Sequence, residues 1–197
     1  MAVIKLSFPT TEKEIRKLNV GDEVFLTGRI ITGRDAAHKW MVDKHPKEVA
    51  EVLKNGCIYH CGPIVKKHKD GSYSFVAAGP TTSIREEPYT PEVLRHYKVR
   101  AAIGKGGLGS GTLAACHRYG AVYLHAIGGL AAELGRRVKK VVDVYKLDDF
   151  GVPEAMWVLD VEDFPTVVTM DSHNNSLHKI IEADSSKILR KLIGVGK

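Results

Sequence analysis

The chain has 197 residues, of which 44% are hydrophobic and 26% are charged, and its formal net charge is +6 at pH 7. These proportions are typical of a globular protein with a buried core and exclude disordered and fibrous classes. No apolar run is long enough to span a membrane, and the first residues lack the layout of a signal peptide. An odd number of cysteines, three, argues against a disulfide framework. We therefore expect a cytoplasmic protein with no membrane partner.

Lys and Arg are scattered along the chain, with two short basic clusters at residues 66–69 and 136–140. A solvated surface is the first explanation, an anionic substrate or acidic partner the second, and nucleic acid the third. Because no aromatic-rich RNA-binding signature or helix-turn-helix pattern accompanies the charge, we expect no nucleic-acid partner.

The N-terminal half of the sequence alternates short apolar runs with turn residues. Thr11 and Glu14 form a possible capping box, Asp35 can cap the next helix, and Asp70-Gly71 is a hairpin signal. We expect strands at 3–8, 23–31, 57–65 (interrupted at Gly62-Pro63) and 73–77, and helices at 12–18, from 35 to 46, and at 46–53.

The C-terminal half continues the irregular alternation. Thr90-Pro91 begins a helix, and Gly120 ends the helix predicted at 110–119. We expect strands at 99–103, 121–127, 138–147, 155–161 and 166–170, a small helix at 129–134, and a closing amphipathic helix at 185–193. Since no repeat, linker or boundary stands out, the prediction is one mixed α/β domain over residues 1–197.

A glycine-rich loop, GKGGLG at residues 104–109, follows a predicted strand and precedes a helix. It matches the G-x-G-x-x-G pattern of dinucleotide sites, but no acidic residue lies about 20 positions further on, where such sites have one. What the pattern supports is an anion site in which Lys105 stands at a helix N-terminus. The alternative is a loop in which glycines only permit tight packing.

Two further turns have the same character. Residues 79–85 (GPTTSIR) place hydroxyl groups and the planar guanidinium of Arg85 after a rigid turn, although helix capping is the commoner role of such hydroxyls. Residues 32–39 (TGRDAAHK) place Arg34 and His38 four residues apart, on one face if the segment is helical, where His38 can act as a catalytic acid or base near neutral pH. A surface-exposed helix start is the alternative. We predict that the three turns converge on one carboxylate-binding site.

The cysteines do not have the spacing of a metal site. Cys57 and Cys61 lie in a predicted strand, where their side chains are about 13 Å apart. With Cys116 they are best explained as buried structural thiols. Five histidines are too dispersed to be proposed as ligands: His60, His117, His125, His173 and His178. We expect this chain itself to bind no metal.

Five segments occur in order along nearly the whole chain: TGRDAAHK (32–39), IYHCGPIV (58–65), GPTTSIR (79–85), GKGGLG (104–109) and PEAMWV (153–158). Together they resemble the β subunit of the class I iron–sulfur fumarate hydratase and L-tartrate dehydratase family, which is equivalent to the C-terminal domain of the single-chain enzymes. The resemblance implies a swivelling β/β/α domain. It also implies a 4Fe-4S cluster held by three cysteines of a partner α subunit, with an α2β2 assembly as our expectation.

The resemblance also assigns roles by position. Arg34 and Arg85 resemble the arginines that bind the substrate carboxylates, and Lys105 resembles the lysine of the glycine loop. Thr81 resembles the hydroxyl residue proposed as the base, and His38 matches a histidine with an active-site role. A threonine hydroxyl is a poor base unless a neighbouring cation lowers its pKa, so Lys105 or Arg85 has to stabilise the alkoxide.

The leading functional hypothesis is therefore the β subunit of a hydro-lyase that is active only with its α subunit. Fumarate hydratase, an enzyme of the tricarboxylic acid cycle, is the first choice, and L-tartrate dehydratase is the alternative. A hypothesis of a different class is a non-catalytic basic binding or scaffold protein, in which the glycine loops are structural.

Overall fold

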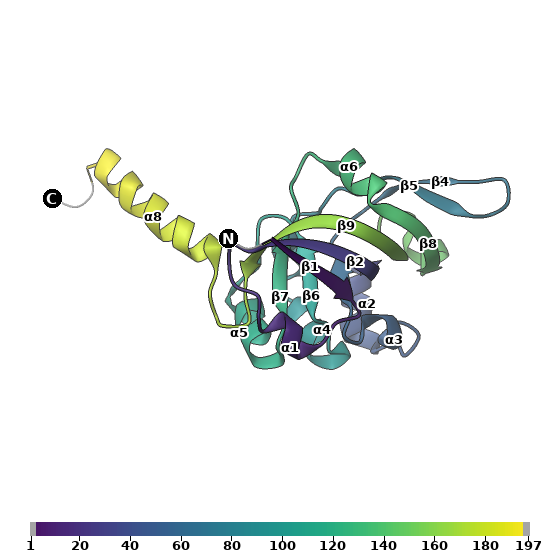
Figure 1. Ribbon diagram of the computed structural model, residues 1–197, viewed down its shortest axis with the longest axis horizontal. Coiled ribbons are helices and arrows are strands. Elements are labelled where there is room, and N and C mark those ends of the chain that lie inside the picture. Colours follow the sequence, from purple (N-terminus) through teal and green to yellow (C-terminus); the bar gives the residue numbers. More distant parts are fainter. Residues whose placement is uncertain (1–2, 195–197) are drawn as a thin grey trace.

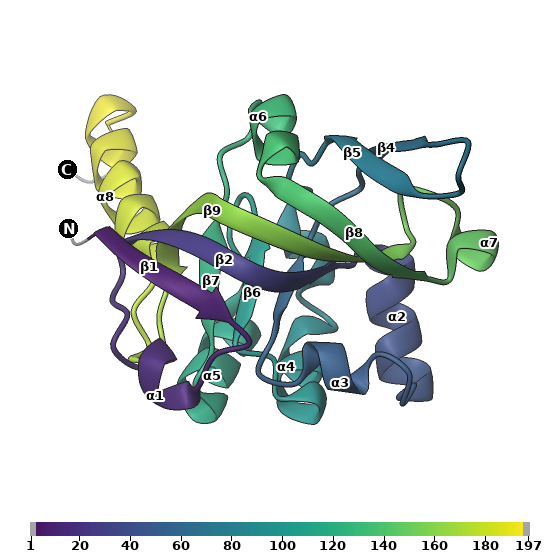
Figure 2. The same cartoon turned by 45° about the vertical axis from the view of Figure 1, so that its right-hand side comes forward.

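A computed structural model of the protein describes residues 3–194 and contains one large sheet and a separate hairpin. The large sheet has seven strands in the order β1-β2-β3-β6-β7-β9-β8, seen obliquely in Figure 2. Their bounds are β1 (Val3–Phe8), β2 (Glu23–Thr32), β3 (Cys57–Tyr59), β6 (Ala101–Gly104), β7 (Val122–His125), β8 (Val138–Tyr145) and β9 (Met156–Met170). The hairpin consists of β4 (Ile64–Lys67) and β5 (Tyr73–Ala77).

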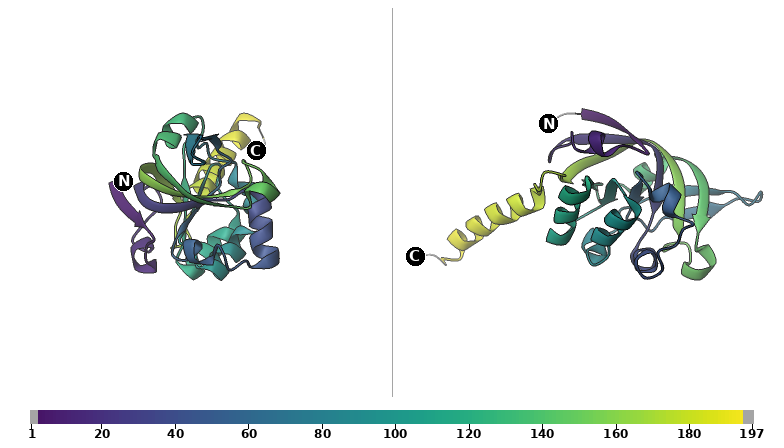
Figure 3. Two further views of the ribbon diagram at one scale, coloured as in Figure 1. Left: turned by 90° about the vertical axis from the view of Figure 1, so that its right-hand side faces the viewer. Right: turned by 90° about the horizontal axis from the view of Figure 1, so that it is seen from below.

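The helices are distributed unevenly around this sheet. Helices α2, α3, α4 and α5 lie together on one side, whereas α6 lies with the hairpin on the other, and α8 projects from the body (Figures 1 and 3). The bounds are α1 (Glu12–Ile15), α2 (Asp35–Lys44), α3 (Ala50–Leu53), the 3-10 helix η1 (Ser83–Glu86), α4 (Thr90–Tyr97), α5 (Ser110–Tyr119), α6 (Ala131–Arg136), α7 (Leu147–Phe150) and α8 (Leu177–Leu192). No helix in residues 3–194 is both long and apolar enough to cross a membrane.

Strand β9 closes the sheet on itself. It pairs antiparallel with β7 and β8 and also with β2, so that β2, β3, β6, β7 and β9 form a ring. Because side chains alternate along a strand, the ring has two apolar faces. Tyr59 and Trp157 belong to one core, and their neighbours Ile58 and Val158 belong to a second core that α2, α3, α4 and α5 cover. Burying each such large side chain contributes about 1.5–3 kcal/mol.

The predicted α/β class is confirmed, and several local predictions are confirmed with it. The Thr11 hydroxyl accepts a hydrogen bond from the Glu14 amide at the start of α1, and α5 spans the predicted residues and ends at Gly120, whose φ is +65°. The hairpin over Asp70-Gly71 is also present. The assignment of residues 1–197 to a single domain of the swivelling type stays a prediction.

Near the C-terminus, the prediction of two separate strands and the prediction of a closing helix are both wrong. The strands predicted at 155–161 and 166–170 are one strand, β9, because an irregularity at Asp163 (φ 46°) is accommodated without breaking the pairing with β2, and the Asp163 amide donates to the Thr27 hydroxyl. Helix α8 begins at Leu177 and not at 185, since the Ser176 hydroxyl accepts from the Lys179 amide. It does not close the domain either, because it has no buried residue.

Smaller corrections concern helix ends. Helix α1 ends at Ile15, earlier than predicted, and α3 begins at Ala50. Asp35 is not the cap of α2: Arg34 occupies the cap position without a side-chain capping bond, and Asp35 lies in the first turn. Helix α7 has no counterpart among the predicted elements.

Candidate functional site

The three glycine-rich turns meet at the carboxyl ends of neighbouring parallel strands. The first turn follows β2, and the third follows β6. The Thr81–Arg85 turn lies against the third, because the Ser83 amide donates to the Lys105 carbonyl at 2.9 Å and the Lys105 amide donates to the Thr81 carbonyl at 3.2 Å. The Thr81 amide in turn donates to the carbonyl of His60, just after β3. Ligand sites of α/β proteins commonly form at this edge of a sheet.

Gly104 allows this close approach. A Cβ atom added at Gly104 would overlap the Ser83 hydroxyl oxygen, so that only glycine fits. The Ser83 side chain is buried and lies 2.8 Å from His60 Nδ1, and it accepts a hydrogen bond from the Tyr123 hydroxyl at 2.9 Å. The Ser83 side chain therefore holds the turn at residues 79–85 in place through these buried contacts, and it does not cap a helix.

His38 connects the first turn to the second. Its Nδ1 lies 3.0 Å from the Arg34 carbonyl oxygen, which can only accept, so Nδ1 carries the proton and Nε2 holds a lone pair. The ring packs edge-on against His60 with 4.9 Å between centroids. Burial lowers the pKa of His38 to about 4, so the imidazole is neutral at pH 7.

A buried acidic side chain, Glu86, lies beside His38. Its Oε2 is 3.7 Å from His38 Nδ1, and neither carboxyl oxygen has a hydrogen-bond partner within residues 3–194. Burial, and then the negative charges of Asp35 and Glu154, raise the pKa of Glu86 to about 8. Its carboxyl group is therefore protonated at pH 7, and the contact with His38 joins two neutral groups and is not an ion pair.

Each of the two predicted substrate arginines has an acidic partner inside the chain. Arg34 Nε lies 3.3 Å from Glu154 Oε1. The other carboxyl oxygen of Glu154, Oε2, accepts a hydrogen bond from the Ala36 amide in the first turn of α2. Arg85 Nε donates to Asp35 Oδ1 at 3.1 Å, and its Nη2 lies 2.9 Å from Oδ2. A guanidinium has further N–H donors, so each arginine can bind a second acceptor while its partner orients it.

Thr81 and Lys105 differ from the arginines in having no side-chain partner. Among residues 3–194, neither the Thr81 hydroxyl nor the Lys105 ammonium makes a side-chain hydrogen bond or ion pair, and both side chains are half-buried. Their backbones are bonded to each other across the two turns. The arrangement can therefore offer a hydroxyl and a cation to the same small anion.

All five predicted site residues thus come from turns that contact one another, and the helix-capping alternative finds no support: Thr82 occupies the cap position of η1 but makes no capping bond. Sequence reasoning missed the residues that support the site, namely His60, Ser83, Glu86, Tyr123 and Glu154. Glu154 lies within the PEAMWV segment, one of the five segments that carry the family resemblance, and could have been found there. No sequence pattern distinguishes Glu86 from an ordinary acidic residue of a turn.

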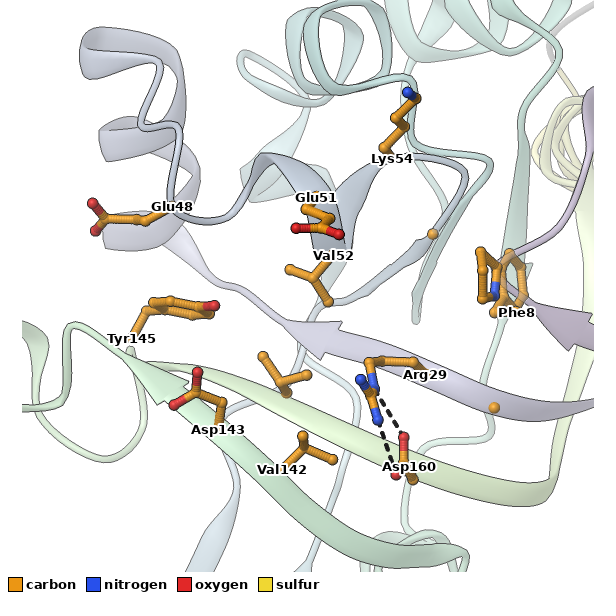
Figure 4. A pocket seen from close by; sticks show the side chains of 14 residues that line it. Phe8, Arg29, Glu48, Glu51, Val52, Lys54, Val142, Asp143, Tyr145 and Asp160 are labelled. Atoms are coloured by element: carbon orange, nitrogen blue, oxygen red, sulfur yellow. Dashed lines mark hydrogen bonds and ion pairs between the residues drawn. The ribbon is translucent and has the colours of Figure 1, made fainter.

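A hollow of about 650 Å³ lies elsewhere, and Figure 4 shows its lining. Arg29 and Asp160 are paired there, and Glu48, Glu51 and Asp143 add negative charge. It contains none of the predicted site residues, and its acidic lining is unsuited to a dicarboxylate.

The three cysteines do not fit an iron–sulfur cluster. All are buried, and Cys57 and Cys61 belong to one core whereas Cys116 belongs to the other. Burial raises the pKa of each thiol, to about 12 for Cys61 and Cys116, which opposes the thiolate form that ligates iron.

Comparison with known proteins places these features in a family. The family described as "Fumarase C-terminus" matches residues 1–181. A putative fumarate hydratase class I of Geobacillus stearothermophilus is 52% identical over 93% of this chain, and the match covers 35% of that relative, so the chain spans about a third of its length. A putative L(+)-tartrate dehydratase subunit beta of Methanocaldococcus jannaschii is 43% identical over 94% of this chain and 96% of its own. The L(+)-tartrate dehydratase subunit beta of Escherichia coli is 33% identical over 87% of this chain and 85% of its own. This chain belongs to the fumarase C-terminus family.

Proposed function

We propose that the chain is the β subunit of an iron–sulfur hydro-lyase that reversibly hydrates fumarate to L-malate. The observation that carries the proposal is the meeting of the three glycine-rich turns, which brings together Arg34, Thr81, Arg85 and Lys105. The relative with 52% identity is named as a putative class I fumarate hydratase. L-tartrate dehydratase is the second candidate, because relatives of similar length are named as its β subunit.

In this proposal the remaining parts of the enzyme come from a partner. The cysteines of this chain are buried and separated, which supports assigning the 4Fe-4S cluster to a partner α subunit. The proposal gives that subunit three cluster cysteines and the complex a cytoplasmic α2β2 assembly. When bound, such a cluster supplies Lewis acidity toward a substrate oxygen. This chain supplies the groups that bind the carboxylates and move the proton.

Arg34 and Arg85 bind the two substrate carboxylates, because a guanidinium presents paired N–H donors that match a carboxylate. When malate loses water, one proton leaves the carbon beside a carboxylate and negative charge develops there. Thr81 accepts that proton as its alkoxide and becomes a neutral hydroxyl, while the substrate hydroxyl group leaves the adjacent carbon as hydroxide. Transfer of the Thr81 proton to this hydroxide releases water and restores the alkoxide, and the Lys105 ammonium stabilises both the alkoxide and the charge that develops on the carbon. In the hydration direction Thr81 returns the proton to the same carbon.

His38 acts by positioning. With its Nδ1 donating to the Arg34 carbonyl and its pKa lowered to about 4, it is a neutral group that holds the Arg34 turn against His60. The Nε2 lone pair is buried and has no hydrogen-bond partner within residues 3–194. His38 therefore sets the orientation of Arg34 and does not carry a positive charge into the site.

The test is hydratase activity on fumarate and on L-tartrate, measured anaerobically after co-expression with the candidate α subunit. Thr81→Ala lowers kcat by about 10²-fold or more, the scale of a lost proton-transfer group, while cluster content and complex formation remain. Thr82→Ala, at the exposed neighbouring hydroxyl, is the matched control and retains activity.

Three results count against the proposal in different ways. Equal activity of Thr81→Ala and Thr82→Ala removes the role of Thr81. A complex with an intact cluster that acts on neither acid indicates another hydroxy-acid substrate. A chain that forms no complex at all favours a non-catalytic scaffold protein.

A further inference from the structure

Helices α2 and α4 bring two histidines and one carboxylate together on the surface, outside the candidate site. His45 follows the last turn of α2, and Glu92 and His96 are four residues apart on α4. One ligand atom from each of the three residues lies within 4.8 Å of the other two. The imidazole rings of His45 and His96 are stacked, with 4.1 Å between centroids.

We propose that His45, Glu92 and His96 bind a divalent transition-metal ion of the zinc type. Two imidazoles and one carboxylate are a donor set that Zn²⁺ uses in proteins, with a water molecule as the fourth ligand. Zinc–ligand bonds of about 2.0–2.2 Å require ligand atoms roughly 3.4 Å apart in a tetrahedral site. The ligand atoms lie within 4.8 Å of one another, so they need to approach by at most about 1.4 Å, which exposed side chains can do by rotating.

The backbone around the cluster is suited to hold it in place. His45 has a left-handed backbone conformation (φ 45°), and its amide donates to the Met41 carbonyl, which ends α2 at this point. The same carbonyl accepts from the Tyr97 hydroxyl of α4 at 3.2 Å. Because both helices are tied at Met41, the three ligands belong to one rigid corner, and both imidazoles are exposed and open to an ion from solvent.

Arg95 competes with the proposed ion. Its Nε and Nη2 donate to the two carboxyl oxygens of Glu92 at 2.8 and 2.6 Å. The arginine is more than half exposed, so solvent screens the pair and an ion can displace it. A metal ion that binds here replaces Arg95 at one oxygen of Glu92.

The ion joins the C-terminal end of α2 to α4, and both helices begin next to the candidate site. Helix α2 begins beside Arg34 and contains His38, and α4 follows the turn that carries Arg85 and Glu86. A bound ion therefore stabilises the folded chain and restrains the two helices relative to each other. This inference does not depend on the proposed function.

The experiment is titration of the full chain with Zn²⁺ by calorimetry, together with the visible absorption of bound Co²⁺. We expect one ion per chain, with at least tenfold weaker affinity in His45→Ala and in His96→Ala. Arg95→Ala, which removes the competing cation, binds Zn²⁺ more tightly than the wild type. His68→Ala, at a histidine of the β4–β5 hairpin, is the control and leaves the affinity unchanged.

A second measurement separates this site from weak surface binding. Zn²⁺ raises the melting temperature of the wild type but not that of His96→Ala, and Mg²⁺ or Ca²⁺, which prefer oxygen ligands, do not compete. Equal Zn²⁺ affinity in the wild type, His45→Ala and His96→Ala overturns the proposal. Weaker binding after Arg95→Ala, or competition by Mg²⁺, also overturns it.

Discussion

Glu86 connects pH to stability at the level of a single residue. Its pKa is about 8 in the folded chain against an ordinary value of 4.5, so the folded form keeps a proton that the unfolded chain releases in this window. Stability from this group is therefore complete below pH 4.5 and falls as the pH rises toward 8. His38 has the opposite sign, because its pKa falls from 6.5 to about 4, and its contribution changes only below pH 6.5.

Above pH 6.5 the contribution of His38 to stability no longer changes, so the effect of Glu86 can be measured separately. Between pH 6.5 and 8 we expect the wild type to lose about 2 kcal/mol of unfolding free energy relative to Glu86→Gln, which cannot ionise. Urea unfolding of both proteins at several pH values measures the difference. Parallel curves for the two proteins would show that the Glu86 carboxyl group is already charged.

Arg85 tests carboxylate recognition. Under the proposed function, Arg85→Lys keeps the charge but loses the planar guanidinium, so we expect KM for the dicarboxylate to rise about tenfold or more, with a smaller change in kcat. Steady-state kinetics of the assembled enzyme provide the measurement. Arg29→Lys is the matched control, since Arg29 also pairs with an aspartate, Asp160, but lies outside the site. An equal effect of both variants would indicate loss of structure and not of binding.

At the level of elements, the site depends on the contact between the Thr81–Arg85 turn and β6. Gly104→Ala places a methyl group on the Ser83 hydroxyl, and we expect a loss of roughly 1–3 kcal/mol in unfolding free energy together with loss of activity. Gly128→Ala is the control, because its Cβ would make only an ordinary contact, 3.6 Å from Lys105 Cδ. Thermal and urea unfolding compare the two, and equal stabilities would contradict the close packing at Gly104.

The turns and strands around the site also show which features could be predicted from the sequence. The turns that carry Arg34 and Lys105 follow short apolar runs that become neighbouring parallel strands, so the approach of these two residues was open to prediction. The turn that carries Arg85 follows β5 of the separate hairpin, and its contact with the Lys105 turn could only be seen in the structure. The continuity of β9 was not open to prediction either, because Asp163 and Pro165 have the composition of a turn and only pairing with β2 holds them in a strand. Glu86 was also hidden, since its burial depends on residues distant in sequence.

At the scale of the whole molecule, α8 is the element least integrated into the fold. It projects from the body in Figure 1, and the apolar side chains along it are exposed, including Ile180, Ile181, Ile188, Leu189 and Leu192. His178, near its start, contacts the Thr169 hydroxyl. The helix therefore contributes exposed apolar surface and little to the core.

Truncation of the chain after Ser185 tests this description. It removes the outer half of α8 but keeps His178 and the Ser176 cap, so we expect the melting temperature to change little and the binding of a hydrophobic dye to fall. Fluorescence titration of the isolated full-length and shortened chains measures the difference. Unchanged dye binding would place the exposed apolar surface on another part of the molecule.

The pairing of Arg34 with Glu154 and of Arg85 with Asp35 has a consequence for selectivity. Each guanidinium is already balanced by a carboxylate of the chain itself, so an incoming acid gains little from the net charge of the two pairs and binds through the N–H donors that remain free. A monoacid uses the free donors of one guanidinium, whereas a diacid uses those of both. Under the proposed function, discrimination between monoacids and diacids therefore depends on the number of guanidinium hydrogen bonds and not on the total charge of the two arginine–carboxylate pairs.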